Sequence, residues 1–170
     1  AATGKNSEMV AEVTSDIGTL YCNQGRYGEA VGAYKEALSA FEKASPVASK
    51  KSLVRANILV NLAEVERRQG SLKSAERNGA EAIAIYAAKL DVNSPTLANA
   101  LNNLALIYRN QGRLQEAEPL YKRAIAIYDL NPGMNSVQAN ALRNYAELLS
   151  ASGRTSEAYT MRVRANDKLS

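Results

Sequence analysis

Residues 99–128 read NALNNLALIYRNQGRLQEAEPLYKRAIAIY, and this stretch decides how the chain folds. Apolar and small side chains recur at gaps of three and four residues on both sides of Gly112. Such spacing places them on one face of a helix. Glycine adopts the left-handed backbone that ends a helix more easily than any other residue. The stretch therefore predicts two amphipathic helices joined by a short turn at the glycine.

The same pattern occurs four times along the chain. The turn glycines Gly25, Gly70, Gly112 and Gly153 are spaced 45, 42 and 41 residues apart. An alanine lies five residues after each glycine and another lies twelve residues after it. Small residues there let neighbouring helices approach closely, so each hairpin buries its apolar stripe by stacking on the next one. We predict an all-α fold, a right-handed α-solenoid of four antiparallel helix-turn-helix hairpins.

The repeats account for nearly the whole chain. We expect a single domain over residues 8–170, preceded by a flexible N-terminal segment at residues 1–7. The predicted repeats span about residues 8–45, 50–90, 95–131 and 136–169. Ser94-Pro95 and Asn135-Ser136 are typical helix starts, and residues 131–133 (NPG) favour a turn between the last two repeats.

This pattern of large, leucine, small and aromatic residues, then glycine, then alanine, aromatic and alanine, resembles a tetratricopeptide repeat. The usual period of that family is about 34 residues. The longer unit here, with EAEPLYKRA and Pro119 inside its second helix, resembles the variant of kinesin light chains and many bacterial proteins. The resemblance covers about residues 10–166 and implies a protein-binding scaffold, without indicating the ligand.

Two repeats depart from the family pattern. Repeat two has Glu66 where tyrosine is usual and Gly79 where an aromatic residue is usual, so we expect its interior to be less well filled. Repeat four has Arg162 at that second position. A polar residue there suits a hairpin that ends the stack, because a terminal repeat needs a polar outer face. Alternatively, the chain is part of a longer array and Arg162 is simply unusual.

The composition excludes several classes of protein. The 170 residues include no histidine and one cysteine, Cys22, which rules out His-dependent catalytic triads, intrachain disulfides and multi-cysteine metal sites. We expect no enzymatic activity, no catalytic residue, no cofactor and no metal. No apolar run approaches the roughly 20 residues of a membrane span, so a soluble protein is expected. The lack of cysteine pairs slightly favours the cytoplasm. Because a cleaved leader would leave no trace, an extracytoplasmic location stays open.

Asparagines carry the functional prediction. Three repeats contain Ala-Asn-x-Leu. In each of them, a second asparagine lies four residues after the first. Residues i and i+4 share a helix face, so the six amides should form two rows along the concave groove of the stack. Amides both donate and accept hydrogen bonds, which suits the backbone of an extended peptide. The predicted peptide contacts are Asn57, Asn61, Asn99, Asn103, Asn140 and Asn144. The alternative is that these amides bridge neighbouring helices.

Arginines near the same helix face would favour an acidic peptide through charge-assisted hydrogen bonds. The candidates are Arg67, Arg109 and Arg143. The family's carboxylate clamp is expected to be absent, because only Asn61 matches among the clamp positions, which are Ser15, Thr19, Asn61, Asn99 and Asn103.

Two other functions stay open at this point. The hairpin stack could self-associate without a peptide client, with the apolar residues Val163 and Leu169 of the last helix as contacts. RNA binding is less favoured, because the net charge of +4 comes from lysines and arginines that are scattered along the chain. We therefore expect a protein or peptide partner and no nucleic acid.

Overall fold

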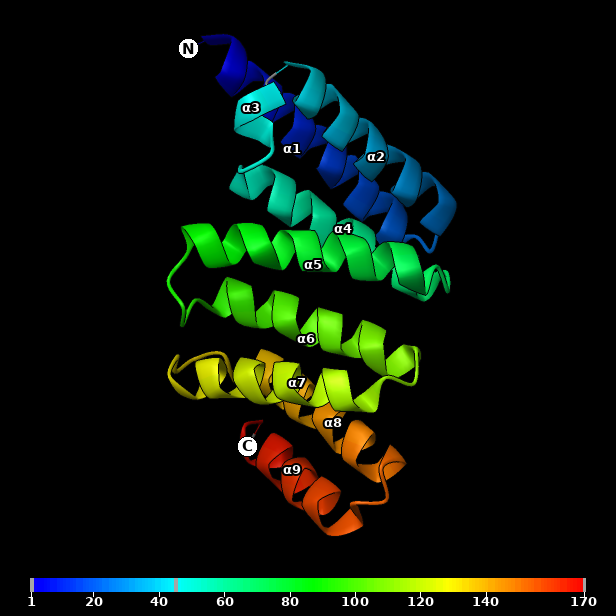
Figure 1. Ribbon diagram of the computed structural model, residues 1–170, viewed down its shortest axis with the longest axis vertical. Helices are drawn as coiled ribbons and strands as arrows, with labels where there is room; N and C mark the ends of the chain where they lie inside the picture. The colour runs from blue at the N-terminus through cyan, green and yellow to red at the C-terminus, as the bar shows by residue number, and fades with distance from the viewer. Residues whose placement is uncertain (1, 45, 170) are drawn as a thin grey trace. The chain divides into compact units, whose positions relative to one another are not determined.

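The computed structural model describes residues 2–44 and 46–169, with the backbone alone at residues 2–7 and 48. Within these ranges the protein is entirely α-helical, with eight long helices and one short one (Figure 1). The helices are α1 (Ala2–Asn23), α2 (Tyr27–Ala44), α3 (Pro46–Ser49), α4 (Leu53–Arg68), α5 (Leu72–Lys89), α6 (Pro95–Asn110), α7 (Leu114–Asp129), α8 (Asn135–Ala151) and α9 (Thr155–Asp167). Apart from α3, they pair as four antiparallel hairpins, which confirms the predicted all-α fold.

Two details differ from the expected boundaries. Helix α1 begins at Ala2, although residues 1–7 were expected to form a flexible segment; Ala1 lies outside the described residues. Each residue added to an existing helix gains a backbone hydrogen bond. The helix of the first repeat therefore continues toward the N-terminus, beyond the residues with the apolar pattern. The link between the first two hairpins contains the four-residue helix α3, which periodicity did not predict.

All four hairpin turns share one geometry. Gly112 has φ 75°, and the next residue, Arg113, donates its backbone N–H to the carbonyl of Tyr108 at 2.9 Å. The glycine is required because other residues rarely adopt a positive φ, and the hydrogen bond satisfies a carbonyl that the ending helix leaves open. The other turns have the same bond, from Arg26 to Tyr21, Ser71 to Glu66 and Arg154 to Leu149.

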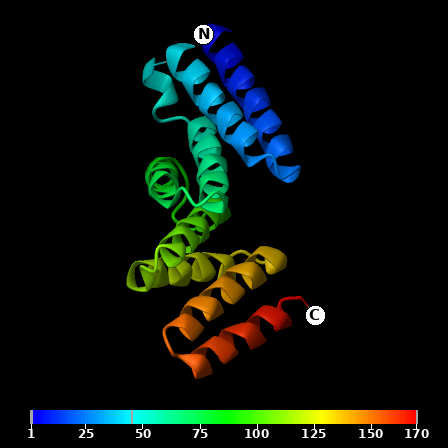
Figure 2. The ribbon, with the colours of Figure 1, turned by 90° about the vertical axis from the view of Figure 1, so that its right-hand side faces the viewer.

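The chain divides into two compact units between Lys89 and Leu90. In the first unit, α1 and α2 lie side by side (Figure 2), and α4 packs against α2. Near the C-terminal end of α1, the ring of Tyr34 lies so close to Gly18 that an added Cβ would be 2.8 Å from a ring carbon. The core of this unit contains Ala11, Ala30, Tyr34, Ala37, Phe41, Ile58, Leu62 and Val65.

The second unit is held together by α7, which packs against both α6 and α8. The ring of Tyr121 on α7 lies 6.0 Å from the ring of Tyr145 on α8, centroid to centroid. The hydroxyl of Tyr145 donates to Glu118 at 2.9 Å, and Arg154 reaches the same carboxylate at 2.9 Å. Glu118 therefore ties the two hairpins of this unit to each other.

The interior of repeat two is polar where repeats one and three are aromatic. Glu66 is only 3% exposed. Its two carboxylate oxygens accept hydrogen bonds from Ser74 Oγ and Asn78 Nδ2, each at 2.8 Å. The space left by the missing aromatic rings is thus occupied by a hydrogen-bonded triad. Within the described residues, no helix is both long and apolar enough to cross a bilayer.

Candidate functional site

The first asparagine of α4 and that of α6 bridge the two helices of their own hairpin. The hydroxyl of Tyr86 donates to Asn57 Oδ1 at 2.6 Å, and the hydroxyl of Tyr128 donates to Asn99 Oδ1 at 2.6 Å. Burial raises the pKa of Tyr86 to about 12 and raises the pKa of Tyr128 as well, so both stay protonated donors. The Oδ1 atoms of these two predicted peptide contacts are therefore used inside the hairpins, as the bridging alternative describes.

Repeat four lacks this bridge. Tyrosine and asparagine lie 29 residues apart in both bridged hairpins, and the residue 29 positions after Asn140 is Leu169. Asn140 is exposed, and its side chain forms no hydrogen bond within the part of the chain that the structure describes. Its amide is thus available to a ligand.

Three amides on α6 and α8 form what we call the amide cluster: Asn102, Asn103 and Asn144. Asn144 Nδ2 donates to Asn102 Oδ1 at 3.3 Å, and Asn102 Nδ2 donates to Asn103 Oδ1 at 3.4 Å. All three side chains are partly exposed. Asn102 was missed in the sequence because it falls outside the four-residue spacing, although its place beside Asn103 was visible there. The cluster joins the first helices of successive hairpins.

Two of the three predicted arginines are paired with carboxylates. Arg67 contacts Glu64 through two bonds of 2.8 Å. Burial alone would raise the pKa of Glu64, but hydrogen bonds from Arg67 and Arg68 outweigh it and lower that pKa. Arg109 Nη1 lies 2.5 Å from Glu147 Oε2 and 3.2 Å from the backbone carbonyl of Asn144. The charges of Arg67 and Arg109 are therefore locally balanced.

A hollow of about 330 Å³, which we call the arginine hollow, lies between α8 and α9. It is lined by Arg143, Glu147, Arg162 and Asn166. Arg143 is exposed and has no ion pair among the described residues. Arg162 donates to Ser150 Oγ at 3.2 Å. The hollow is lined by two guanidinium groups and by one carboxylate, that of Glu147, which also pairs with Arg109. The positive charge therefore exceeds the negative charge, and the hollow favours a negatively charged group.

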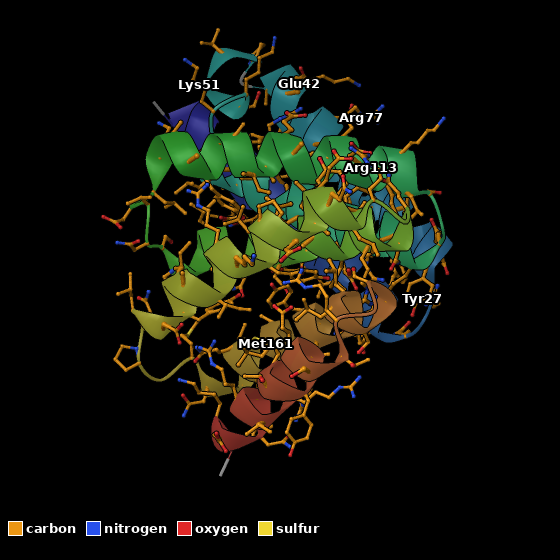
Figure 3. All side chains as sticks on the ribbon, turned by 60° about the horizontal axis from the view of Figure 1, so that its bottom comes forward. Tyr27, Glu42, Lys51, Arg77, Arg113 and Met161 are labelled. Carbon is orange, nitrogen blue, oxygen red and sulfur yellow. The ribbon has the colours of Figure 1, made fainter. Side chains whose placement is uncertain are left out.

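From the sequence, Arg162 was either part of the polar outer face of a terminal hairpin or an unusual residue within a longer array. The structure places it opposite Arg143 in this hollow, on the helix that Figure 3 marks with Met161. The two residues are 19 positions apart and lie on different helices, so no helical spacing could have brought them together.

The nine predicted contact residues are divided between the two units. The first unit carries Asn57, Asn61 and Arg67, and the second carries Asn99, Asn103, Asn140, Asn144, Arg109 and Arg143. The structure brings Asn103, Asn144 and Arg109 together through the bonds described above. Asn61 is exposed on α4 and forms no side-chain hydrogen bond within the described ranges. A continuous row of amides across α4, α6 and α8 stays a prediction.

Two family models, both described as tetratricopeptide repeat, match residues 54–130 and 15–88. Together they span residues 15–130, which is more than half of the chain. The chain is a tetratricopeptide-repeat protein. No curated protein sequence matches it significantly. Tetratricopeptide repeats indicate a protein–protein interaction scaffold, so this repeat protein falls in that class.

Several solved structures share the fold. BtubC (BKLC) from P. vanneervenii aligns with TM-score 0.86 at 23% identity, over 95% of this repeat protein and 64% of that chain. A kinesin light chain protein with nearly identical TPR-like repeats from Podosopora anserina gives TM-score 0.73 at 19% identity, over 94% and 74%. MamA gives 0.65 at 20% identity, over 93% and 77%. The protein thus spans less than two thirds of BtubC, and these likenesses establish the fold alone.

Proposed function

We propose that the second unit binds an extended, acidic segment of a partner protein along α6 and α8. The observation that supports this most is the amide cluster, because three partly exposed asparagines meet at the junction of two first helices. Asparagine is a poor residue for a helix interior. Several of them on one face are therefore better explained by a polar partner than by helix stability.

The cluster leaves hydrogen-bonding groups of both kinds available. Within the described residues, Asn103 uses its Oδ1 and Asn144 uses its Nδ2. This leaves the Nδ2 donor of Asn103 and the Oδ1 acceptor of Asn144, together with the whole amide of Asn140. A donor and an acceptor on neighbouring helices suit the C=O and N–H of an extended backbone. Such contacts hold a peptide without reading its side chains.

Selectivity for acidic segments would come from the arginine hollow. Arg143 directly precedes Asn144 on α8, and Arg162 on α9 lines the same hollow. A carboxylate of the partner would form charge-assisted hydrogen bonds with these guanidinium groups, which are shorter and stronger than neutral ones. Arg109 has a different role, since Glu147 already balances its charge and its contact with the backbone of Asn144 positions the cluster.

In the first unit, taken by itself, Asn61 and Arg67 stay predicted peptide contacts. Asn61 offers an exposed amide on α4, as Asn140 does on α8. Asn57 and Asn99 take a supporting part, because their Oδ1 atoms hold the hairpins together.

Fluorescence anisotropy with two labelled decapeptides tests the proposal. One probe alternates Glu and Ser, and the other alternates Lys and Ser. We expect only the acidic probe to bind, and the Asn103→Ala/Asn144→Ala variant to bind it at least tenfold more weakly, at about 1.4 kcal/mol per factor of ten. The control is Asn23→Ala, at the exposed end of α1. Equal affinity of the double variant and the parent, with unchanged helicity, would show that the amides do not bind the partner.

A further inference from the structure

Helix α1 carries an exposed apolar face that the proposed function does not use. Val10, Val13, Ile17 and Leu20 follow one another at gaps of three, four and three residues, which places them on one side of the helix. Their exposed fractions are 54%, 55%, 43% and 60%. Four large apolar side chains in one row are unlike the scattered surface apolar residues of a monomeric protein. We call this row the α1 stripe.

The same repeat positions are buried in α4, which is the first helix of the next hairpin. Val13, Ile17 and Leu20 lie 12, 8 and 5 residues before their turn glycine. The residues at these distances before Gly70 are Ile58, Leu62 and Val65, and none is more than 2% exposed. They are buried because α4 packs against α2, the second helix of the preceding hairpin.

Helix α8 repeats this arrangement in the second unit. Its corresponding residues are Ala141, Tyr145 and Leu148, exposed by at most 5%, and α8 packs against α7. The α1 stripe is thus the face on which a first helix receives the second helix of another hairpin.

The second unit offers such a helix. In α2 and α7, the residues 16 positions after the turn glycine are Phe41 and Tyr128, each 1% exposed. The corresponding residue after Gly153 is Leu169, just beyond the end of α9, which is 51% exposed, and Tyr159 on α9 is 68% exposed. Helix α9 is therefore a second helix whose outer side has no cover within the described part of the protein.

The two surfaces also have opposite charge. The side chains of residues 8–23 include Glu8, Glu12 and Asp16 and neither lysine nor arginine. The end formed by α8 and α9 carries Arg143 and Arg162 in the arginine hollow. Two α1 helices facing each other would bring these carboxylates together, so the charges favour α9 over a second α1.

The repeat register predicts which residues would meet. In the second unit, Asn102 of α6 contacts Asn144 of α8, ten and nine residues before their turn glycines. At the same two positions, α8 has Arg143 and α1 has Asp16. The stacking step that joins the two amides would thus join a guanidinium to a carboxylate.

We propose that the α1 stripe of one copy docks on the α8–α9 end of a second copy, in the geometry by which α8 docks on α6 and α7. Because the two surfaces differ, the contact is heterologous and adds copies into open chains. The apolar core of the contact joins Ile17 to the outer side of α9, and Asp16 pairs with Arg143. This interaction goes beyond the peptide binding proposed above. The two share only the arginine hollow, so a docked copy and an acidic segment compete there.

Sedimentation velocity over a series of concentrations tests this contact with two blocked variants. Ile17→Lys blocks the stripe, because it adds a cation that faces the arginines. Tyr159→Glu/Arg162→Glu blocks the other end, because it adds carboxylates that face Asp16. The parent should form species larger than dimers as the concentration rises. Each blocked variant should stay monomeric, while an equimolar mixture of the two should give a heterodimer and nothing larger, since one intact surface of each kind remains.

Controls separate this result from misfolding and from the peptide site. Ala126→Lys adds the same charge at an exposed position of α7 and should associate like the parent, and all variants should keep the parent's helicity. Ile17→Lys should still bind the acidic decapeptide, and Asn103→Ala/Asn144→Ala should still associate. A parent that stays monomeric at every concentration overturns the proposal. So does a Tyr159→Glu/Arg162→Glu variant that still dimerises, because the stripe would then pair with itself.

Discussion

The hairpins α4–α5 and α6–α7 share an outline and differ in their interior. Both have the tyrosine–asparagine bond of 2.6 Å between residues 29 positions apart. In α6–α7, Arg113 stacks 4.3 Å from the ring centroid of Tyr108 and pairs with Glu116 at 2.6 Å. Figure 3 labels Arg113 at this turn. In α4–α5, serine replaces both the arginine and its carboxylate partner, and Glu66 replaces the tyrosine.

This difference shows what the repeat needs. A surface cation on an aromatic ring and a buried carboxylate with two donors both leave the turn glycine and its hydrogen bond in place. A buried polar group is tolerated when its hydrogen bonds are complete and is costly when they are not. The α4–α5 hairpin should therefore be more sensitive to single changes in its interior than the α6–α7 hairpin.

The largest effect is expected from Glu66→Leu. The change leaves Ser74 Oγ and the buried Asn78 without their acceptor, and a buried donor left unsatisfied costs about 1–3 kcal/mol. Urea unfolding followed by circular dichroism measures the loss. Adding Ser74→Ala and Asn78→Leu should restore much of it, because no donor then lacks a partner. A single variant as stable as the parent would show that the triad contributes nothing.

Glu118→Gln tests the polar contact that joins the hairpins of the second unit. A hydrogen bond from Lys122 lowers the pKa of Glu118 to about 2, with further hydrogen bonds from Arg154 and Tyr145, although burial opposes the shift. We expect a loss of about 1.5 kcal/mol near neutral pH. Because the folded pKa lies below the ordinary value of 4.5, the carboxylate stabilises the fold above that pH, and its contribution is lost as the pH falls toward 2. Urea unfolding at several pH values should therefore show parent and variant converging in acid. A gap that persists at pH 2 would contradict this.

Tyr86→Phe and Tyr128→Phe compare the shared bond in the two hairpins. Each removes one hydroxyl donor to an exposed asparagine, for which about 1 kcal/mol is typical. Because the two bonds have the same length, we expect the two losses in thermal or urea unfolding to agree. Asn140→Ala serves as the control and should have almost no effect on stability. Leu169 stands where the other two hairpins have the tyrosine, so Asn140 forms no such hydrogen bond. Clearly unequal losses would mean that the hairpins use the bond differently.

Arg113→Ser makes the third turn resemble the second and should have the smallest effect. The ion pair with Glu116 is exposed, and the stacking on Tyr108 is at the surface, so a loss of about 0.5 kcal/mol is expected. Raising the salt concentration should reduce the difference between variant and parent in urea unfolding. A loss as large as that of Glu66→Leu would contradict the distinction drawn between the two interiors.

The hairpins were predictable because their determinants are local. The glycine spacing located all four turns, and the three-and-four spacing of apolar residues located the helices on both sides. The start of α1 at Ala2 was missed, since residues 2–7 carry no apolar repeat. The bond between Tyr128 and Asn99 could have been inferred from the sequence, because two repeats have a tyrosine 29 residues after this asparagine. The residue 29 positions after Asn140 is Leu169, which cannot form the bond.

The candidate site was predictable only in part, because packing brings its members together. Asn103 and Asn144 follow from the helical spacing. The pairing of Arg109 with Glu147, 38 positions away, depends on how α8 lies against α6. The same holds for Arg162, which faces Arg143 in the arginine hollow. Contacts between helices of different repeats require the stacking register, which periodicity within one helix does not contain.

The most direct test of the proposed binding face is an NMR titration of the side-chain amides with the acidic decapeptide. The Nδ2 resonances of Asn103, Asn140 and Asn144 should shift with a common saturation curve. Those of Asn57 and Asn99 should move far less, since these side chains stay bound to their tyrosines. Shifts confined to amides outside α6 and α8, or saturation without any change at Asn103 and Asn144, would contradict the account.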